Sequence, residues 1–190
     1  MDTYGSDEYR AHYADMVLER MGSEPRPYVF LTPEWCDAYE KTLQTDERYK
    51  QVARNWEGSV VLVFLPDPGA GMTGTLHVYL DLWHGNCGYV RLVPENVGRT
   101  ADYVLVAEYR RWEKIVQGEL NVVKELATRR LRLTPFDFKK AVNLAAAAQA
   151  AVRLVELAGA VGARYPSDLA EDARGALQTL WAGLKTDFGL

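Results

Sequence analysis

A stretch of nine residues in which apolar and polar side chains alternate constrains the fold of this chain most strongly. In TLHVYLDLW (Thr75–Trp83), the leucines and valine at even positions fall on one face, and His77 and Asp81 fall on the other. A period of two over this length is typical of a β-strand that buries one face. The chain is therefore expected to contain a sheet whose apolar face must be covered by other elements.

Further strands are indicated on both sides of this stretch. SVVLVFL (Ser59–Leu65) is continuously apolar and rich in β-branched residues, which is typical of a central strand covered on both faces. Shorter apolar or alternating runs predict strands at residues 89–93, 102–108 and 130–133. A turn rich in glycine and proline, PDPGAGMTG (Pro66–Gly74), separates the two strongest strands.

Helices are expected before and after the strands. An amphipathic pattern covers residues 7–22, and Thr32-Pro33 and Thr134-Pro135 resemble helix starts, with a capping residue before a proline in the first turn. A second helix restarts at Thr45, short helices follow at 109–118 and 121–129, one long helix runs over 134–162, and a terminal helix covers 167–184. This order of elements predicts an α+β layer fold.

The polar residues of the alternating strand raise the possibility of a metal or proton-transfer site. On a strand, His77 and Asp81 are separated by roughly 13 Å, since each residue advances the chain by ~3.3 Å. Zinc donors must lie within about 2 Å of the ion, so this pair cannot share one. We therefore expect no metal site, and we interpret both residues as polar groups on the outer face.

No other pattern in the chain points to a cofactor or to catalysis. The glycine-rich turn lacks the lysine of a phosphate-binding loop and joins two strands instead of opening a helix. Cys36 and Cys87 have neither metal-ligand spacing nor a disulfide framework, so we expect free thiols in a reducing cytoplasm. We predict no catalytic residues and no cofactor.

Charge and hydropathy exclude two further classes of protein. The formal net charge of −4 argues against chain-wide attraction to nucleic acid or to anionic membranes. The pairs Arg110–Arg111 and Arg129–Arg130 are interpreted as ordinary surface charges. No apolar run approaches the ~20 residues of a spanning helix, so no transmembrane segment is expected.

Three strings carry a likeness to a known family. DERYKQVARNWEGSVVLVF (Asp46–Phe64), YLDLWHGNC (Tyr79–Cys87) and YRRWEKIVQGELNVVKELATRRLRL (Tyr109–Leu133) resemble the sterol carrier protein type two family, especially its stand-alone bacterial and archaeal members. The resemblance spans roughly Leu31 to Gly162. The chain departs from the family pattern at Thr128–Asp137, where Arg130 and Pro135 stand in place of two glycines, so we expect a different turn there.

The resemblance implies a five-stranded, mostly antiparallel sheet, covered on one face by helices that enclose an apolar tunnel. It also implies a non-enzymatic carrier of an apolar lipid, such as a fatty acyl chain, an acyl-CoA or a sterol-like molecule. We expect a cavity of about 300–1,000 Å³, the usual size of a small-molecule site. Its expected lining is Leu80, Leu82, Val104, Val106, Trp112, Ile115, Val122, Leu126, Phe138 and Val142. The corresponding division of the chain is an N-terminal arm (1–30), a carrier domain (31–162) and a C-terminal helical extension (163–190).

Several alternatives remain open from the sequence. The alanines of the long helix either allow close packing or leave room for a ligand. An enzyme acting on an apolar substrate in the same pocket, with His77 or Asp81 as acid or base, is the second hypothesis. A protein-interaction module without ligand is the third. The apolar face of the terminal helix is expected to cover the tunnel as a lid, or else to form a homodimer interface.

Overall fold

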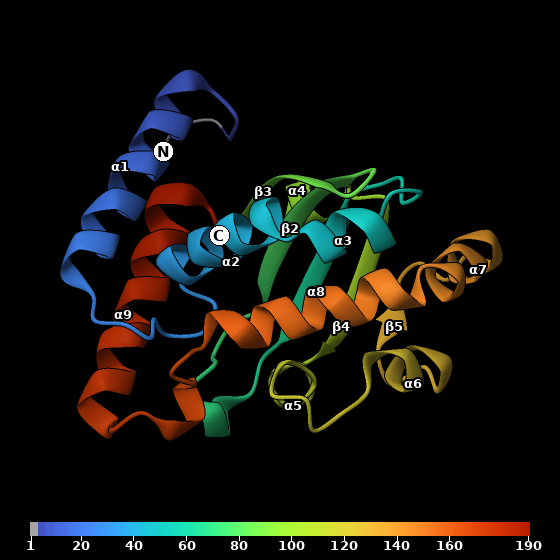
Figure 1. Ribbon diagram of the computed structural model, residues 1–190. Coiled ribbons are helices and arrows are strands. Elements are labelled where there is room, and N and C mark those ends of the chain that lie inside the picture. The colour runs from blue at the N-terminus through green and yellow to red at the C-terminus, as the bar shows by residue number, and fades with distance from the viewer. Residues whose placement is uncertain (1–3) are drawn as a thin grey trace.

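The computed structural model describes residues 4–190, and its centre is a five-stranded sheet (Figure 1). The strands are β1 (Val60–Leu65), β2 (Leu76–Trp83), β3 (Asn86–Leu92), β4 (Tyr103–Glu108) and β5 (Arg132–Leu133). Their order is β3-β2-β1-β4-β5. Neighbours pair antiparallel except β1 and β4, which are parallel. The α+β class and the mostly antiparallel sheet are thus confirmed.

Helices occupy the connections and both ends of the chain. Before the sheet lie α1 (Asp7–Ser23), α2 (Pro33–Thr45) and α3 (Glu47–Val52). Between strands lie the 3-10 turn η1 (Pro68–Ala70), α4 (Glu95–Gly98), α5 (Tyr109–Val116) and α6 (Val122–Ala127). After β5 follow α7 (Phe138–Ala146), α8 (Ala148–Val161), the turn η2 (Pro166–Asp168) and α9 (Glu171–Phe188).

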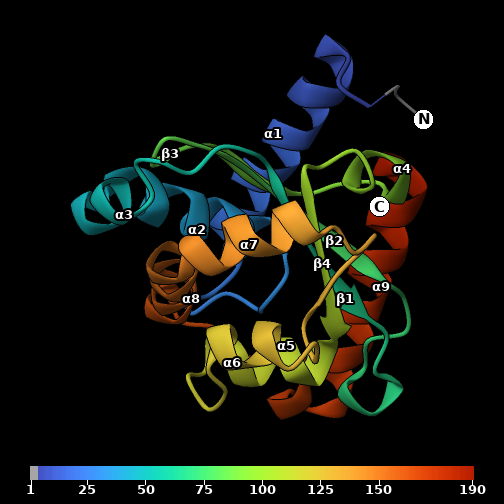
Figure 2. The same cartoon turned by 90° about the vertical axis from the view of Figure 1, so that its right-hand side faces the viewer.

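The two faces of the sheet differ in what covers them. Helices α2 and α8 lie over one face of the sheet (Figure 2). Val60, Leu62 and Phe64 of β1 point to this face, where they line a hollow together with residues of both helices. Val61 and Val63 point to the other face and are also buried, in a small cluster with Val93 and Ala101. The prediction that β1 is covered on both faces is confirmed, because even the second face of this strand is closed to water.

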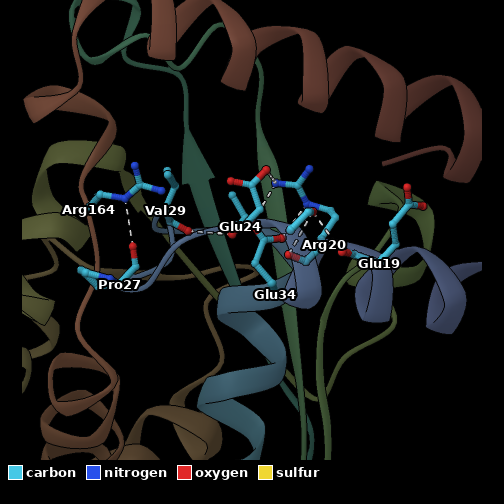
Figure 3. Close-up of polar contacts among 9 residues, drawn as sticks. Glu19, Arg20, Glu24, Pro27, Val29, Glu34 and Arg164 are labelled. Atoms are coloured by element: carbon cyan, nitrogen blue, oxygen red, sulfur yellow. Dashed lines mark hydrogen bonds and ion pairs between the residues drawn. The ribbon is translucent and has the colours of Figure 1, made fainter.

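Helix α1 is fixed to the rest of the molecule by a buried ion pair. The guanidinium of Arg20 donates to both carboxylate oxygens of Glu34 on α2, at 2.7 and 2.8 Å (Figure 3). Glu34 is only 1% exposed, so this bidentate pair replaces the water that its charge would otherwise need. The apolar residues Tyr9, Tyr13 and Val17 of α1 join the main hydrophobic core.

The segment after α8 is paired with the segment before α2. The backbone N–H of Arg164 donates to the Tyr28 carbonyl, and the Phe30 N–H donates to the Arg164 carbonyl. The Arg164 side chain adds a bond from Nε to the Pro27 carbonyl at 2.9 Å (Figure 3). From this point the chain runs to α9, where Phe188 packs edge-on against Tyr9 and Tyr13 of α1.

The long helix predicted over residues 134–162 is instead two helices. α7 and α8 meet at Ala147 and are bent by 69° relative to each other. Contacts with the sheet explain the bend, because the Asn143 amide donates to the Tyr103 hydroxyl at 3.1 Å and Lys140 donates to the Asp102 carbonyl. Both bonds hold α7 against the start of β4. No single helix within residues 4–190 has the length and apolar character needed to cross a membrane.

Candidate functional site

An apolar cavity of about 80 Å³ lies between the sheet and the helices of its covered face, and we call it the inner cavity. The sheet contributes Val60, Leu62, Phe64, Val78, Leu80, Leu82 and Leu105. Residues 30–56 contribute Phe30, Leu31, Trp35, Tyr39, Tyr49 and Trp56. The later helices and their connections contribute Trp112, Val116, Val122, Leu126, Leu131, Leu144, Ala147, Ala150, Ala151, Leu154, Val155 and Ala158.

The few polar atoms on these side chains are largely satisfied by the protein itself. Trp112 donates its indole N–H to the Val63 carbonyl at 2.9 Å, and the Tyr39 hydroxyl donates to the Leu154 carbonyl at 2.9 Å. Burial raises the pKa of Tyr39 well above its ordinary value, so its hydroxyl stays neutral. Among the described lining residues, Trp35 has a buried indole N–H with no hydrogen-bond partner. The inner cavity therefore suits an apolar molecule.

A second hollow of about 310 Å³ lies beside the inner cavity, and we call it the outer groove. It is bounded by α6, β5, α7 and the start of α8. Its lining is Val123, Leu126, Ala127, Arg129, Leu131, Leu133, Phe136, Phe138, Ala141, Leu144, Ala145 and Ala148. Leu126, Leu131 and Leu144 line both hollows, so these three side chains form the partition between them.

Two solved structures are similar to this chain over most of their own length. The crystal structure of sterol carrier protein 2 has 35% sequence identity and a TM-score of 0.60, and the match covers 68% of this chain and 97% of that one. The solution structure of a conserved hypothetical protein from Thermus thermophilus, described as a possible sterol carrier protein, has 34% identity and a TM-score of 0.62. That match covers 77% of this chain and 99% of the other.

The chain belongs to the sterol carrier protein 2 family. No protein-family model matches the chain, and no curated protein matches it. Membership therefore rests on the identity and nearly full coverage of the two structures. Sterol carrier protein 2 leaves roughly a third of this chain unmatched, and the Thermus relative leaves roughly a quarter.

The structure brings half of the sequence-predicted ligand residues to the inner cavity of this sterol carrier fold. Leu80, Leu82, Trp112, Val122 and Leu126 all line it. Ile115 is fully buried but does not border either hollow. Whether any of these residues binds a ligand stays a prediction.

Val104 and Val106 do not line the inner cavity, contrary to the expectation from the sequence. The parallel register places Val104 opposite Val61 and Val106 opposite Val63, so both valines point to the second face of the sheet. Leu105, between them, lines the inner cavity. Every residue from Tyr103 to Ala107 is apolar or aromatic, so the sequence offered no polar position from which to identify the outer face.

The two predicted residues on α7 also lie elsewhere. Phe138 is 76% exposed and borders the outer groove, and Val142 is 50% exposed and borders neither hollow. The bend at Ala147 is the physical reason, because it turns α7 away from the sheet face that α8 covers. The terminal helix α9 contributes no lining residue and lies at the opposite end of the molecule from α7 (Figure 1), so its predicted role as a lid over the cavity is wrong.

Sequence reasoning missed the aromatic residues that precede the sheet. Phe30, Trp35, Tyr39 and Tyr49 line the inner cavity from α2, α3 and their approach. The spacing of four residues between Trp35 and Tyr39 indicated a buried helix face but not what that face would meet. The sheet residues opposite them are far away in sequence, which no local pattern reveals.

His77 and Asp81 do not reach either hollow. His77 lies on the second face of the sheet and is only 9% exposed, because α4 packs over it with Gly98 against its ring. Burial lowers the pKa of His77, so its ring stays neutral to lower pH than an exposed histidine. Asp81 is exposed. Within residues 4–190 no group of three potential metal ligands gathers, at these residues or elsewhere.

Proposed function

We propose that this protein binds and carries an apolar lipid, with an acyl chain or comparable hydrocarbon in the inner cavity. The observation that carries the proposal is the inner cavity itself, which retains empty volume although almost every side chain around it is hydrophobic. Protein interiors normally close such space, because atoms that border a void have no packing partner on one side. The solved relative named sterol carrier protein 2 supports the same interpretation.

The size of the hollows bears on how a lipid would fit. About 80 Å³ is less than the 300–1,000 Å³ expected, whereas the outer groove of about 310 Å³ falls within that range. Movement of Leu126, Leu131 and Leu144 would join the two. We therefore propose that a bound chain displaces this partition and occupies both hollows as one tunnel.

A non-enzymatic role is part of this proposal. The second hypothesis, an enzyme with His77 or Asp81 as acid or base, loses support because both residues lie away from the inner cavity. An interaction module without ligand would leave the inner cavity empty at all times. The cytoplasmic location, the division into arm, domain and extension, and a possible homodimer stay predictions.

Native mass spectrometry of freshly purified protein, followed by extraction and identification of the released molecules, tests the proposal. We expect a fraction of the protein to carry a stoichiometric mass that is lost on mild activation and recovered as a lipid in the extract. Protein that carries no lipid, and takes none up from added fatty acid or sterol, would contradict the carrier function and favour the interaction module.

A further inference from the structure

The segment that frames the outer groove carries most of the large apolar side chains that the described surface exposes. Five such residues are strongly exposed in residues 4–190, and Phe136, Phe138 and Val142 are three of them, at 57%, 76% and 50%. The other two, Leu18 and Trp83, lie on α1 and at the end of β2. Phe136 and Phe138 border the outer groove, and Val142 lies one turn of α7 beyond Phe138. Single exposed apolar residues are ordinary, but a cluster beside an apolar groove indicates a surface that is covered by a partner when the protein functions.

Basic side chains lie on the same segments as this apolar cluster. Lys124, Arg129, Arg130 and Lys139 are all exposed, and none of them forms an ion pair with a described residue. Arg132 is exposed too, but it pairs with Val106 in the sheet and therefore points to the second face, away from the outer groove. The guanidinium of Arg129 lies over the ring of Phe136, 4.8 Å from its centroid. Of the acidic groups in the same stretch, Glu125 is buried against Arg111, and Asp137 accepts a hydrogen bond from the Lys140 N–H. The local charge is thus positive in a chain whose net charge is −4.

We propose that this surface, the apolar cluster with the basic residues of the same segments, docks the protein on an anionic lipid bilayer with the outer groove facing the membrane. The aromatic rings would enter the interfacial layer, and the arginines and lysines would meet lipid phosphates. The outer groove shares Leu126, Leu131 and Leu144 with the inner cavity, so docking would place the opening of the proposed tunnel against the source of its ligand. The biological purpose of this docking rests on the proposed lipid-carrier function, whereas vesicle binding can be measured independently of it.

Charge also favours an anionic bilayer over a second copy of the same chain as the partner of this surface. In a twofold dimer through this face, the unpaired basic residues of the two copies would oppose each other. An anionic bilayer instead offers opposite charge over the whole surface, together with an apolar interior for Phe136 and Phe138. The arginine pair Arg129–Arg130, interpreted above as ordinary surface charge, gains a role under this proposal.

Flotation with lipid vesicles tests the docking directly. We expect the full chain to float with vesicles that contain phosphatidylserine, to float poorly with phosphatidylcholine alone, and to be released as salt screens the charges. Lys124→Glu with Arg130→Glu should reduce binding at least about tenfold, since each basic residue near an anionic surface contributes roughly a fivefold change in affinity. Phe136→Ser with Phe138→Ser should reduce it by a similar factor without altering the circular dichroism spectrum.

Matched controls alter residues that border neither hollow. Arg10→Glu with Lys185→Glu makes the same change in charge on α1 and α9, and Trp83→Ser removes an exposed aromatic from another surface. Both controls should bind vesicles as the unaltered protein does. Equal loss in the controls, full binding by the groove variants, or no binding of the unaltered protein to anionic vesicles would overturn the proposal.

Two further measurements distinguish membrane docking from its alternatives. Binding of a fluorescent fatty acid in the absence of vesicles should be unchanged in the Lys124→Glu, Arg130→Glu variant, so loss of docking and loss of the carrier function are distinguishable. Inorganic phosphate at the concentration of lipid phosphate should not release the protein from vesicles. A doubling of mass without vesicles that Phe136→Ser with Phe138→Ser abolishes would show a second copy as the occupant and would contradict the membrane.

Discussion

Gly159 and Ala150 both lie on α8, yet they meet different surroundings. A Cβ atom added to Gly159 would lie 2.8 Å from the Val116 carbonyl oxygen, so glycine lets α8 approach α5 closely. Ala150 is 4% exposed and borders the inner cavity, where its short side chain leaves space. Close packing at a glycine and open space at an alanine thus occur at different positions of one helix.

The glycine of the turn between β2 and β3 provides a residue-level prediction. Gly85 and Gly118 share a φ of 78°, but a Cβ at Gly85 would lie 2.4 Å from the Lys50 carbonyl oxygen, whereas nothing lies within 4 Å at Gly118. Gly118→Ala should lower the free energy of unfolding by roughly 1–2 kcal/mol, the cost of placing alanine in the left-handed backbone conformation. Gly85→Ala should lower the free energy of unfolding by about 1–3 kcal/mol more, because backbone atoms must move.

Urea denaturation of the two alanine variants measures this difference. The shared φ makes Gly118→Ala the control for backbone strain, so the excess loss in Gly85→Ala reports the contact with α3 alone. Equal unfolding free energies for the two variants would show that the turn does not pack against Lys50.

At the scale of elements, the strength of the local pattern decided what the sequence could predict. The alternation of residues 75–83 and the β-branched run of residues 59–65 predicted β2 and β1 closely, because one or both faces are buried. The sequence could not predict which residues of β4 face the inner cavity, since both faces of this strand are apolar. The bend at Ala147 was not predictable either, because alanine favours helix and the cause is tertiary, in the bonds from Asn143 and Lys140 to the start of β4.

Helix α7 is expected to unfold locally more often than α8. α7 buries Leu144 alone, while α8 buries Ala150, Leu157 and Ala158. Asn143→Ala removes the bond to the Tyr103 hydroxyl and should speed amide hydrogen exchange in residues 138–146 by about two- to tenfold, the effect of one hydrogen bond of roughly 0.5–1.5 kcal/mol. Exchange in α8 should not change.

Hydrogen exchange followed by mass spectrometry resolves the two helices. Gln149→Ala removes an exposed amide from α8 and serves as the control that leaves both helices as they were. If α7 exchanges as slowly as α8 in the unaltered protein and in Asn143→Ala, the partition between inner cavity and outer groove is rigid, and the proposed joining of the two hollows has no mobile element.

At the scale of the whole molecule, binding and docking are assigned to one end. α6 and α7 lie at the end of the molecule away from α1 and α9 (Figure 1). They frame the outer groove, which Phe136, Phe138 and Arg129 border. The chain's net charge of −4 does not reveal this local positive surface, because summed composition averages over the molecule. The family resemblance anticipated the fold, but the segment that departs from the family pattern is the one that frames the groove.

The measurement that tests the central claim most directly is the affinity of Ala150→Leu for a fluorescent long-chain fatty acid. Leucine at this position fills the inner cavity from α8, so we expect at least about a tenfold loss of affinity with thermal stability retained or raised, as expected for a filled void. Ala182→Leu, at an exposed position of α9, controls for the substitution itself, and Ala158→Val provides a milder filling if Ala150→Leu unfolds. Fatty acid binding of equal affinity in the unaltered protein and in folded Ala150→Leu would contradict the claim that the inner cavity holds the ligand.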